Sequence, residues 1–304
     1  MNLTNYNITS IEEAFEEVRK QANSRGVRVT GSEIVGLVPK EAMLRAGIYY
    51  LRKQNRSIAV PDIDIIDFGI DALGLNEIAN FNQDSSIIEN RIKNSNRLIN
   101  LEVSSFINEV STESPAPGGG SVSALAGALG SSLVAMVSNL SFGKKGYEAN
   151  RDLIEQIGTE AQNIKNSLLI LVDQDTQAFD GIISALRMPK KTLEQKKIRK
   201  EQIEITTKYA ISVPLSIMEF SLLTLSLSKK IMKIGNKNSI SDAGVASELS
   251  AASINGAYMN VLINLKDIDS KAYKAKILKK AKKIINKSDN EIRISRFNLY
   301  KMLK

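Results

Sequence analysis

An acidic residue on an apolar helical stripe is the clearest candidate for chemistry in this sequence. Across residues 151–187 the apolar residues recur at alternating intervals of three and four, and the position that continues the series between Leu171 and Phe179 is Asp175. Asp173 lies about 200° away around such a helix and faces elsewhere. A buried carboxylate is costly unless it is paired, hydrogen-bonded or protonated, so Asp175 serves either structure or a task. Desolvation would raise its pKa and suit it to general acid or base catalysis.

The composition restricts the other chemistry that is available. The 304 residues include no Cys and no His. This excludes thiolate nucleophiles, Ser-His-Asp triads, imidazole bases and metal sites built from Cys or His. Reactions must therefore use carboxylates, Lys, Tyr, Ser, Thr or backbone dipoles. We expect no metal, and we expect a cytoplasmic location because no disulfide can form.

A glycine-rich loop is the most unusual local sequence. Two prolines precede three glycines and a serine, at Pro115, Pro117, Gly118, Gly119, Gly120 and Ser121. Glycines let a backbone approach another group closely, and amides at the start of the following helix suit an anion. The alternative is that these glycines only permit tight helix packing. The small residues Ser123, Gly127 and Ser131 follow at four-residue spacing and indicate close packing against another helix.

Two further polar segments are candidate anion sites. Lys144 and Lys145 stand in a glycine-flanked turn, and Asn238 and Asp242 lie where a polar loop enters a helix rich in Ala and Ser. The ordinary interpretations are solvated turn lysines and, for Asp242, an acid in the first turn of a helix.

The elements that position these residues fall into two regions. Residues 1–55 predict a small α/β fragment with strands at 1–6 and 27–38 and helices at 10–23 and 39–52. This fragment is too small to bury a good core alone, so it must dock on the rest of the chain or on another subunit. Residues 56–85 contain turn-forming clusters and predict a linker. Residues 86–304 carry helical spacing, so the fold class is mainly α, a helical bundle preceded by the α/β fragment.

The net charge of +8 belongs to the end of the chain. Residues 271–304 hold 12 Lys and Arg against 2 acidic residues, and the remaining residues are close to neutral. This segment predicts an amphipathic basic helix, ordinarily with a solvated lysine face and alternatively a site for a polyanion. Aromatic residues make up only 5%, so we expect no nucleic-acid partner.

The sequence does not favour a membrane partner. No basic patch followed by an apolar core stands at the amino end, so we expect no secretory signal. The uncharged stretch between Glu113 and Lys144 is long enough to span a bilayer, but it is built from Ser, Ala and Gly. Such a composition fits a buried core helix better.

Several motifs occur in an order that resembles a known family. They are Glu113 to Ser123 (ESPAPGGGSVS), Val172 to Phe179 (VDQDTQAF), Arg187 to Lys190 (RMPK), Gly235 to Ala246 (GNKNSISDAGVA) and Tyr258 to Leu265 (YMNVLINL). Together they are similar to the formimidoyltetrahydrofolate cyclodeaminase family. Residues 1–6 and 26–39 resemble the closing part of a glutamate formimidoyltransferase. Because the catalytic first part of that transferase is missing here, we expect no transferase activity.

The resemblance implies a helical, dimeric enzyme of one-carbon metabolism and histidine degradation, with its folate pocket at the subunit interface. The implied reaction converts 5-formimidoyltetrahydrofolate to 5,10-methenyltetrahydrofolate and ammonia without a metal. The catalytic aspartate of the family falls on Asp175. By analogy, the pocket would also be lined by Gly118, Gly119, Gly120, Ser121, Lys144, Lys145, Asn238 and Asp242, and the two lysines would attract the glutamate tail of a polyglutamylated folate.

Two alternatives remain open at this point. One is a methenyltetrahydrofolate cyclohydrolase, an activity assigned to relatives of this domain. The other is a non-catalytic assembly subunit whose amino-terminal fragment contacts a separate formimidoyltransferase.

Overall fold

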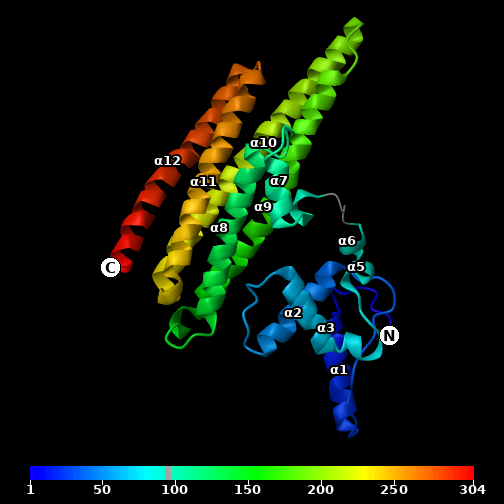
Figure 1. Cartoon of the computed structure of the whole chain (residues 1–304). Coiled ribbons are helices and arrows are strands. Elements are labelled where there is room, and N and C mark those ends of the chain that lie inside the picture. The colour runs from blue at the N-terminus through cyan, green and yellow to red at the C-terminus, as the bar shows by residue number, and fades with distance from the viewer. Residues whose placement is uncertain (93–96) are drawn as a thin grey trace. The chain divides into compact units, whose positions relative to one another are not determined.

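The computed structural model describes residues 1–92 and 97–304, which belong to two compact units, Met1–Ser95 and Asn96–Lys304 (Figure 1). The first unit contains six helices among its described residues: α1 (Ile11–Ser24), α2 (Lys40–Lys53), α3 (Asp62–Leu73), α4 (Leu75–Ile78), α5 (Gln83–Ser86) and α6 (Ile88–Arg91). Its core lies mainly between α2 and α3, where Met43, Ile66 and Leu73 are fully buried. The two helices cross so closely that a Cβ atom on Gly47 would lie 2.0 Å from the carbonyl oxygen of Ile65.

The strands expected in the first unit are not formed. Among the described residues, residues 1–6 and 27–37 adopt no β-structure, and Val38 makes a single parallel bridge with Ile87. Within 28–37, the one described backbone amide that donates to a backbone oxygen belongs to Ser32, which bonds to Gly74 at 3.3 Å. A strand needs a neighbouring strand to satisfy its backbone, and the described part of this unit provides none. The alternating segment therefore belongs to no sheet among the described residues.

The stretch expected to be a linker is also ordered. Residues 56–85 contain α3, α4 and most of α5, and α3 buries Ile65, Ile66, Ile70 and Leu73. Ile65 and Ile66 of this buried face lie between the acidic positions Asp64 and Asp67, and Ile70 and Leu73 follow them. The acids lie in the first turns of α3, where the helix dipole favours negative charge. The two units divide at Ser95 and Asn96 rather than across this stretch.

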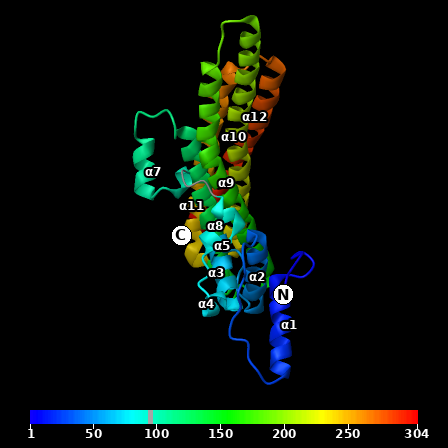
Figure 2. The same cartoon turned by 90° about the vertical axis from the view of Figure 1, so that its right-hand side faces the viewer.

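The second unit is a bundle of long helices, as Figure 1 and the turned view in Figure 2 show. It contains α7 (Val103–Val110), α8 (Gly119–Phe142), α9 (Arg151–Arg187), α10 (Leu193–Ile234), α11 (Ile240–Asn264) and α12 (Lys271–Met302). Single turns of 3₁₀ helix lie at Leu98–Asn100, Glu148–Asn150, Lys237–Ser239 and Leu265–Asp267. α8 packs on α9 and α11, α10 contacts α8, α9, α11 and α12, and α12 lies against α10 and α11. The predicted helical bundle is thus confirmed.

The small-residue stripe on α8 packs inside this bundle. Ser123 lies beside Gly256 of α11, and Gly127 faces Ser221 of α10 and Ser253 of α11. Ser131 donates a hydrogen bond to the carbonyl oxygen of Ala161 in α9 at 2.8 Å. The stripe therefore lets three helices approach α8 closely.

Within residues 1–92 and 97–304, two helices, α8 and α10, are long and apolar enough to cross a membrane on length and composition alone. In each of them, 61% of the most apolar 18-residue window is buried inside the protein. Core helices of a bundle have the same properties.

Candidate active site

The start of α8 meets the middle of α9 through Asp175. The backbone amide of Ser121 donates to Oδ2 of Asp175 at 2.9 Å, and the Ser121 hydroxyl lies 3.2 Å from the same oxygen. A Cβ atom on Gly120 would lie 2.0 Å from Oδ1 of Asp175, so only glycine permits this approach. The anion at the amino end of α8 is thus the carboxylate of Asp175 itself.

Burial raises the pKa of Asp175 above its ordinary value. The hydrogen bonds from the Ser121 hydroxyl and amide act in the opposite direction, because they stabilise the ionised form. Burial has the larger effect. The carboxyl group is half-buried and borders a cavity, so it can exchange a proton with a bound molecule.

The cavity beside Asp175 has a volume of about 130 Å³. Phe179 and Ile182 of α9 line it, together with Asn260 and Asn264 near the end of α11. The Nδ2 atoms of Asn260 and Asn264 donate to the backbone oxygens of Gly256 and Ala210 at 2.9 and 2.8 Å. Their Oδ1 atoms are therefore available as acceptors for a cationic or N–H group.

Asn260 and Asn264 were not predicted as site residues. The available signal was their four-residue spacing, which places both amides on one face of a helix. That spacing alone cannot indicate which other helix the face meets.

Asp173 is buried as well, on another side of α9. Its exposed fraction is 6%, and its Oδ2 atom accepts a hydrogen bond from Nε of Arg97 at 2.9 Å. The other oxygen accepts the backbone amide of Leu98 at 2.7 Å. Asp173 is therefore a paired structural carboxylate, whereas Asp175 faces a cavity.

The remaining predicted site residues lie at the other end of α8. Nζ of Lys144 donates to Oδ1 of Asn236 at 2.8 Å, and the backbone amide of Asn238 donates to the same oxygen at 3.1 Å. Lys145 is exposed, and Asp242 is half-buried in the first turn of α11. Asn236 was not predicted as a site residue. It is buried, and its backbone amide donates to the hydroxyl of Ser141 at 2.7 Å.

These two groups of residues do not meet within one chain. α8 has 24 residues, so at 1.5 Å per residue its ends are about 36 Å apart. Gly118, Gly119, Gly120 and Ser121 lie at the Asp175 end. Lys144, Lys145, Asn238 and Asp242 lie at the opposite end, because α11 runs antiparallel to α8.

No group of three or more Asp and Glu side chains among the described residues is arranged to hold a metal ion.

Both units of the chain are similar to known proteins. Residues 102–283 match the family Formiminotransferase-cyclodeaminase, and residues 1–93 match the Formiminotransferase domain. The formimidoyltransferase-cyclodeaminase of Rattus norvegicus is 31% identical over 90% of this chain, and the match covers 51% of that protein. The chain thus spans about half the length of such curated relatives.

Two shorter relatives match part of the chain. A methenyltetrahydrofolate cyclohydrolase of Methylorubrum extorquens is 35% identical over 59% of this chain and 86% of its own length. The crystal structure of formiminotetrahydrofolate cyclodeaminase from Thermotoga maritima has a TM-score of 0.58 and 28% identity, covering 67% of this chain and 96% of that one. The family match spans the glycine loop, Asp175 and both asparagines. This chain belongs to the formiminotransferase-cyclodeaminase family.

Proposed function

We propose that this protein is a formimidoyltetrahydrofolate cyclodeaminase, a lyase that converts 5-formimidoyltetrahydrofolate to 5,10-methenyltetrahydrofolate and ammonia. The observation that carries the proposal is a half-buried carboxyl group with a raised pKa, Asp175, held at a glycine loop and facing a cavity. The protein has no His, so this carboxyl is the group suited to moving a proton near neutral pH.

Asp175 serves both proton transfers of the reaction. Its carboxylate holds the protonated formimidoyl group on N5, with Oδ1 of Asn260 and Asn264 as further acceptors. N10 attacks the formimidoyl carbon, a C–N10 bond forms, and the proton of N10 passes to Asp175. Asp175 then gives that proton to the amino nitrogen, the C–NH₃ bond breaks, and ammonia leaves. Holding N10 against the carbon supplies much of the acceleration.

A second copy of the chain completes the pocket in this proposal. A cavity of about 130 Å³ is smaller than the roughly 300 Å³ or more of a typical ligand pocket. Exposed apolar residues run along α8 at Val122, Leu129, Met136 and Leu140, and Val245, Met259 and Ile263 are exposed on the neighbouring α11. Such a surface favours burial against a partner. An antiparallel twofold pairing brings the Lys144 end of one protomer to the Asp175 end of the other.

The test is to supply 5-formimidoyltetrahydrofolate to the purified protein and to follow methenyl absorbance and ammonia together. We expect equal amounts of both products and a loss of at least about 100-fold in kcat for Asp175→Asn. The matched control is Asp180→Asn, an exposed acid on the same helix, which should keep its activity. A folded, dimeric protein that releases no ammonia would refute the proposal.

The runner-up activity is methenyltetrahydrofolate cyclohydrolase, supported by the relative from Methylorubrum extorquens. In that case water rather than N10 would be the nucleophile, and the methenyl compound would be the substrate. Measuring kcat/KM for both compounds with one protein preparation separates the two activities. A preference for the methenyl compound would favour the cyclohydrolase.

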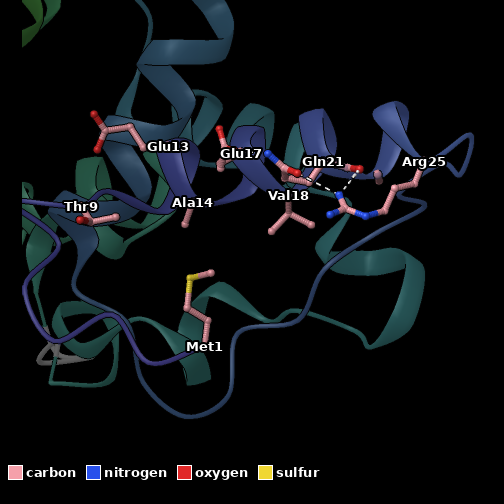
Figure 3. A pocket seen from close by; sticks show the side chains of 9 residues that line it. Met1, Thr9, Glu13, Ala14, Glu17, Val18, Gln21 and Arg25 are labelled. Carbon is pink, nitrogen blue, oxygen red and sulfur yellow. Dashed lines mark hydrogen bonds between the residues drawn. The ribbon is translucent and has the colours of Figure 1, made fainter.

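A second candidate function is docking of a separate formimidoyltransferase by the first unit. The observation that favours it is the unpaired alternating segment 27–37, which exposes Val27 and Val35. The unit also has a groove of about 630 Å³ between Met1 and the Ala14 and Val18 face of α1 (Figure 3). An unpaired extended segment can add to the edge of a partner sheet.

Size-exclusion chromatography with a purified glutamate formimidoyltransferase tests this docking. The complex should form with the unaltered chain and be lost with Val35→Asp. The control is Ile78→Asp, which also places a charge at an exposed apolar position, on α4, and should keep the complex. Absence of any complex would remove this candidate. We expect no formimidoyl transfer by the chain alone in the same assay.

A further inference from the structure

Ser121 is buried against Asp175 rather than open to the cavity. Its exposed fraction is 0%, and the described residues that line the cavity include Gly120 and Asp175 but not Ser121. The Ser121 hydroxyl lies near three oxygens: the backbone oxygen of Val172 at 2.9 Å, Oδ2 of Asp175 at 3.2 Å and Oγ1 of Thr176 at 3.4 Å. A molecule in the cavity would meet Asp175, and Ser121 would act on it only through that carboxyl.

The Ser121 hydroxyl has a single hydrogen for these acceptors, and a hydroxyl rotates to suit its surroundings. When Asp175 is ionised, its charge makes Oδ2 the stronger acceptor, because hydrogen bonds to charged groups are roughly twice as strong as neutral ones. When Asp175 is protonated, the backbone oxygen of Val172 is the nearer acceptor, at 2.9 Å against 3.2 Å. The hydrogen can therefore change its acceptor while every heavy atom stays in place.

Both hydrogen-bond donors of Ser121 lie beside the same oxygen of Asp175. The backbone amide donates to Oδ2 at 2.9 Å in either protonation state of the carboxyl, and the hydroxyl lies next to it. An oxygen that accepts an N–H group is the carbonyl oxygen of a protonated acid, so the proton is carried by the other oxygen, Oδ1. Oδ1 lies on the side of Gly120, which lines the cavity.

The surroundings of Asp175 contain no competing charge. Among the described residues that line the cavity, Asp175 is the only titratable group. On the same helix, Asp173 is turned to another side and paired with Arg97. The other helices around the cavity contribute Gly119 and Gly120 from α8, Ala210 from α10, and Asn260 and Asn264 from α11. Burial and the hydrogen bonds from Ser121 are therefore the local influences on the pKa of Asp175.

We propose that Ser121 is a positioning residue whose hydroxyl changes its acceptor as Asp175 gains or loses a proton. It donates to Oδ2 of the ionised carboxylate, and to the backbone oxygen of Val172 when the carboxyl is protonated. Ser121 keeps its own hydrogen throughout, and the transferred proton is carried on Oδ1. The part of this inference that concerns turnover rests on the proposed function. There, the hydroxyl stabilises the ionised form and so keeps Asp175 able to accept the proton of N10.

Carbon-13 NMR of the purified protein tests the change of acceptor without turnover. The sequence contains one Val–Asp pair, Val172 and Asp173, so labelling the carbonyl carbon of Val and the nitrogen of Asp gives one signal for that carbonyl. Labelled Asp carboxyl carbons report Asp175, which is identified by the loss of its signal in Asp175→Asn. We expect the Val172 carbonyl signal to move with pH at the midpoint of the Asp175 carboxyl, and not to move in Asp175→Asn. A Val172 signal that is constant in wild type, or that moves equally in Asp175→Asn, would overturn the proposal even if serine variants do not fold.

Ser121→Ala removes the hydroxyl, and Ser131→Ala is its matched control. Ser131 is equally buried on α8 and donates to the backbone oxygen of Ala161 in α9 at 2.8 Å, but it lies away from Asp175. Ser121→Ala should raise the midpoint of the Asp175 titration by about one pH unit, since a hydrogen bond to a charged group is lost, and should abolish the movement of the Val172 signal. Ser131→Ala should change neither. Equal midpoints in the two variants would contradict the assignment.

The pH dependence of kcat/KM separates this inference from the proposed activity. If 5-formimidoyltetrahydrofolate is converted, the acid limb of the profile should move to higher pH in Ser121→Ala by the same amount as the titration, and should stay in place in Ser131→Ala. NMR shifts as expected without release of ammonia would support the role of Ser121 and refute only the activity. Turnover with the same acid limb in both variants would retain the activity and overturn the inference.

Discussion

Asp173 and Asp175 are two residues apart on α9, yet their surroundings assign them different roles. Asp173 is paired with Arg97 and accepts the amide of Leu98, so its charge is compensated by the protein. Asp175 receives hydrogen bonds only from Ser121 among the described residues, and its pKa is raised by burial. A carboxyl that the fold leaves partly uncompensated is available to a substrate.

This difference predicts an effect of pH on stability. The pKa of Asp175 in the folded protein is raised above its ordinary value of 3.8. At a pH above this raised pKa, ionisation of the Asp175 carboxyl therefore lowers the stability of the folded protein. That cost disappears below the ordinary value, where the folded and unfolded chains are both protonated. Asp175→Asn should therefore raise Tm at pH 8, and the difference from wild type should shrink toward pH 4. Calorimetry that finds a lower Tm for the variant at pH 8 would contradict the argument.

Gly120 supplies a second prediction at the residue scale. A methyl group there would lie 2.0 Å from Oδ1 of Asp175 and displace the carboxyl. Gly120→Ala should lower kcat by about 100-fold or more, as loss of a general acid or base does. Gly143→Ala is the control, because no atom lies within 4 Å of the added methyl, and it should keep its activity. Equal activity in both variants would show that the close approach is unimportant.

At the scale of elements, small side chains decide how closely the helices pack. A Cβ atom on Gly127 would lie 2.6 Å from the hydroxyl of Ser221 and 2.8 Å from that of Ser253, where α8 meets α10 and α11. Those two hydroxyls are hydrogen-bonded to each other at 2.8 Å in the buried core. Added volume at this point forces helices apart and disturbs that hydrogen bond.

Two glycine substitutions in helices should therefore have opposite effects. Gly127→Ala should lower the free energy of unfolding by about 1–3 kcal/mol through overpacking. The methyl group added by Gly181→Ala on α9 would lie 3.6 Å from Thr206, an ordinary contact. This substitution should raise the free energy of unfolding by about 0.5–1 kcal/mol through helix propensity. Urea unfolding of both variants measures the difference. Destabilisation of similar size at both sites would mean that helix packing does not depend on the stripe.

At the scale of the whole molecule, the apolar face of α8 and α11 predicts the oligomeric state. Leu129→Arg places a charge at the centre of the proposed twofold interface, so the protein should become monomeric and lose most of its activity. Phe297→Arg, an exposed position on α12, should remain dimeric and active. Light scattering during chromatography reports both masses. A monomeric wild type, or a dimeric Leu129→Arg protein, would exclude this interface.

Much of the helical architecture follows from the sequence alone. The three- and four-residue apolar spacing predicted the helix over residues 151–187, and capping residues and prolines placed α1 and α2 to within a residue or so. α3, which helps to form the core of the first unit, was instead predicted to be part of a linker. The same spacing singled out Asp175, because a polar residue on an apolar stripe is visible locally. Alternation in residues 27–37 was equally clear but produced no strand, since pairing requires a partner strand and residues 1–92 contain none.

The sequence by itself determined the long helix over residues 151–187, which loop is rich in glycine, and which carboxyl interrupts the apolar stripe. Tertiary structure decided that Ser121 binds Asp175, that Asp173 is paired with Arg97, and that Lys144 and Asn238 lie at the opposite end of the bundle. Local periodicity records only which face of a helix is apolar. Which faces meet, and in which direction, depends on contacts between residues far apart in the chain, and those are set by packing of the whole bundle.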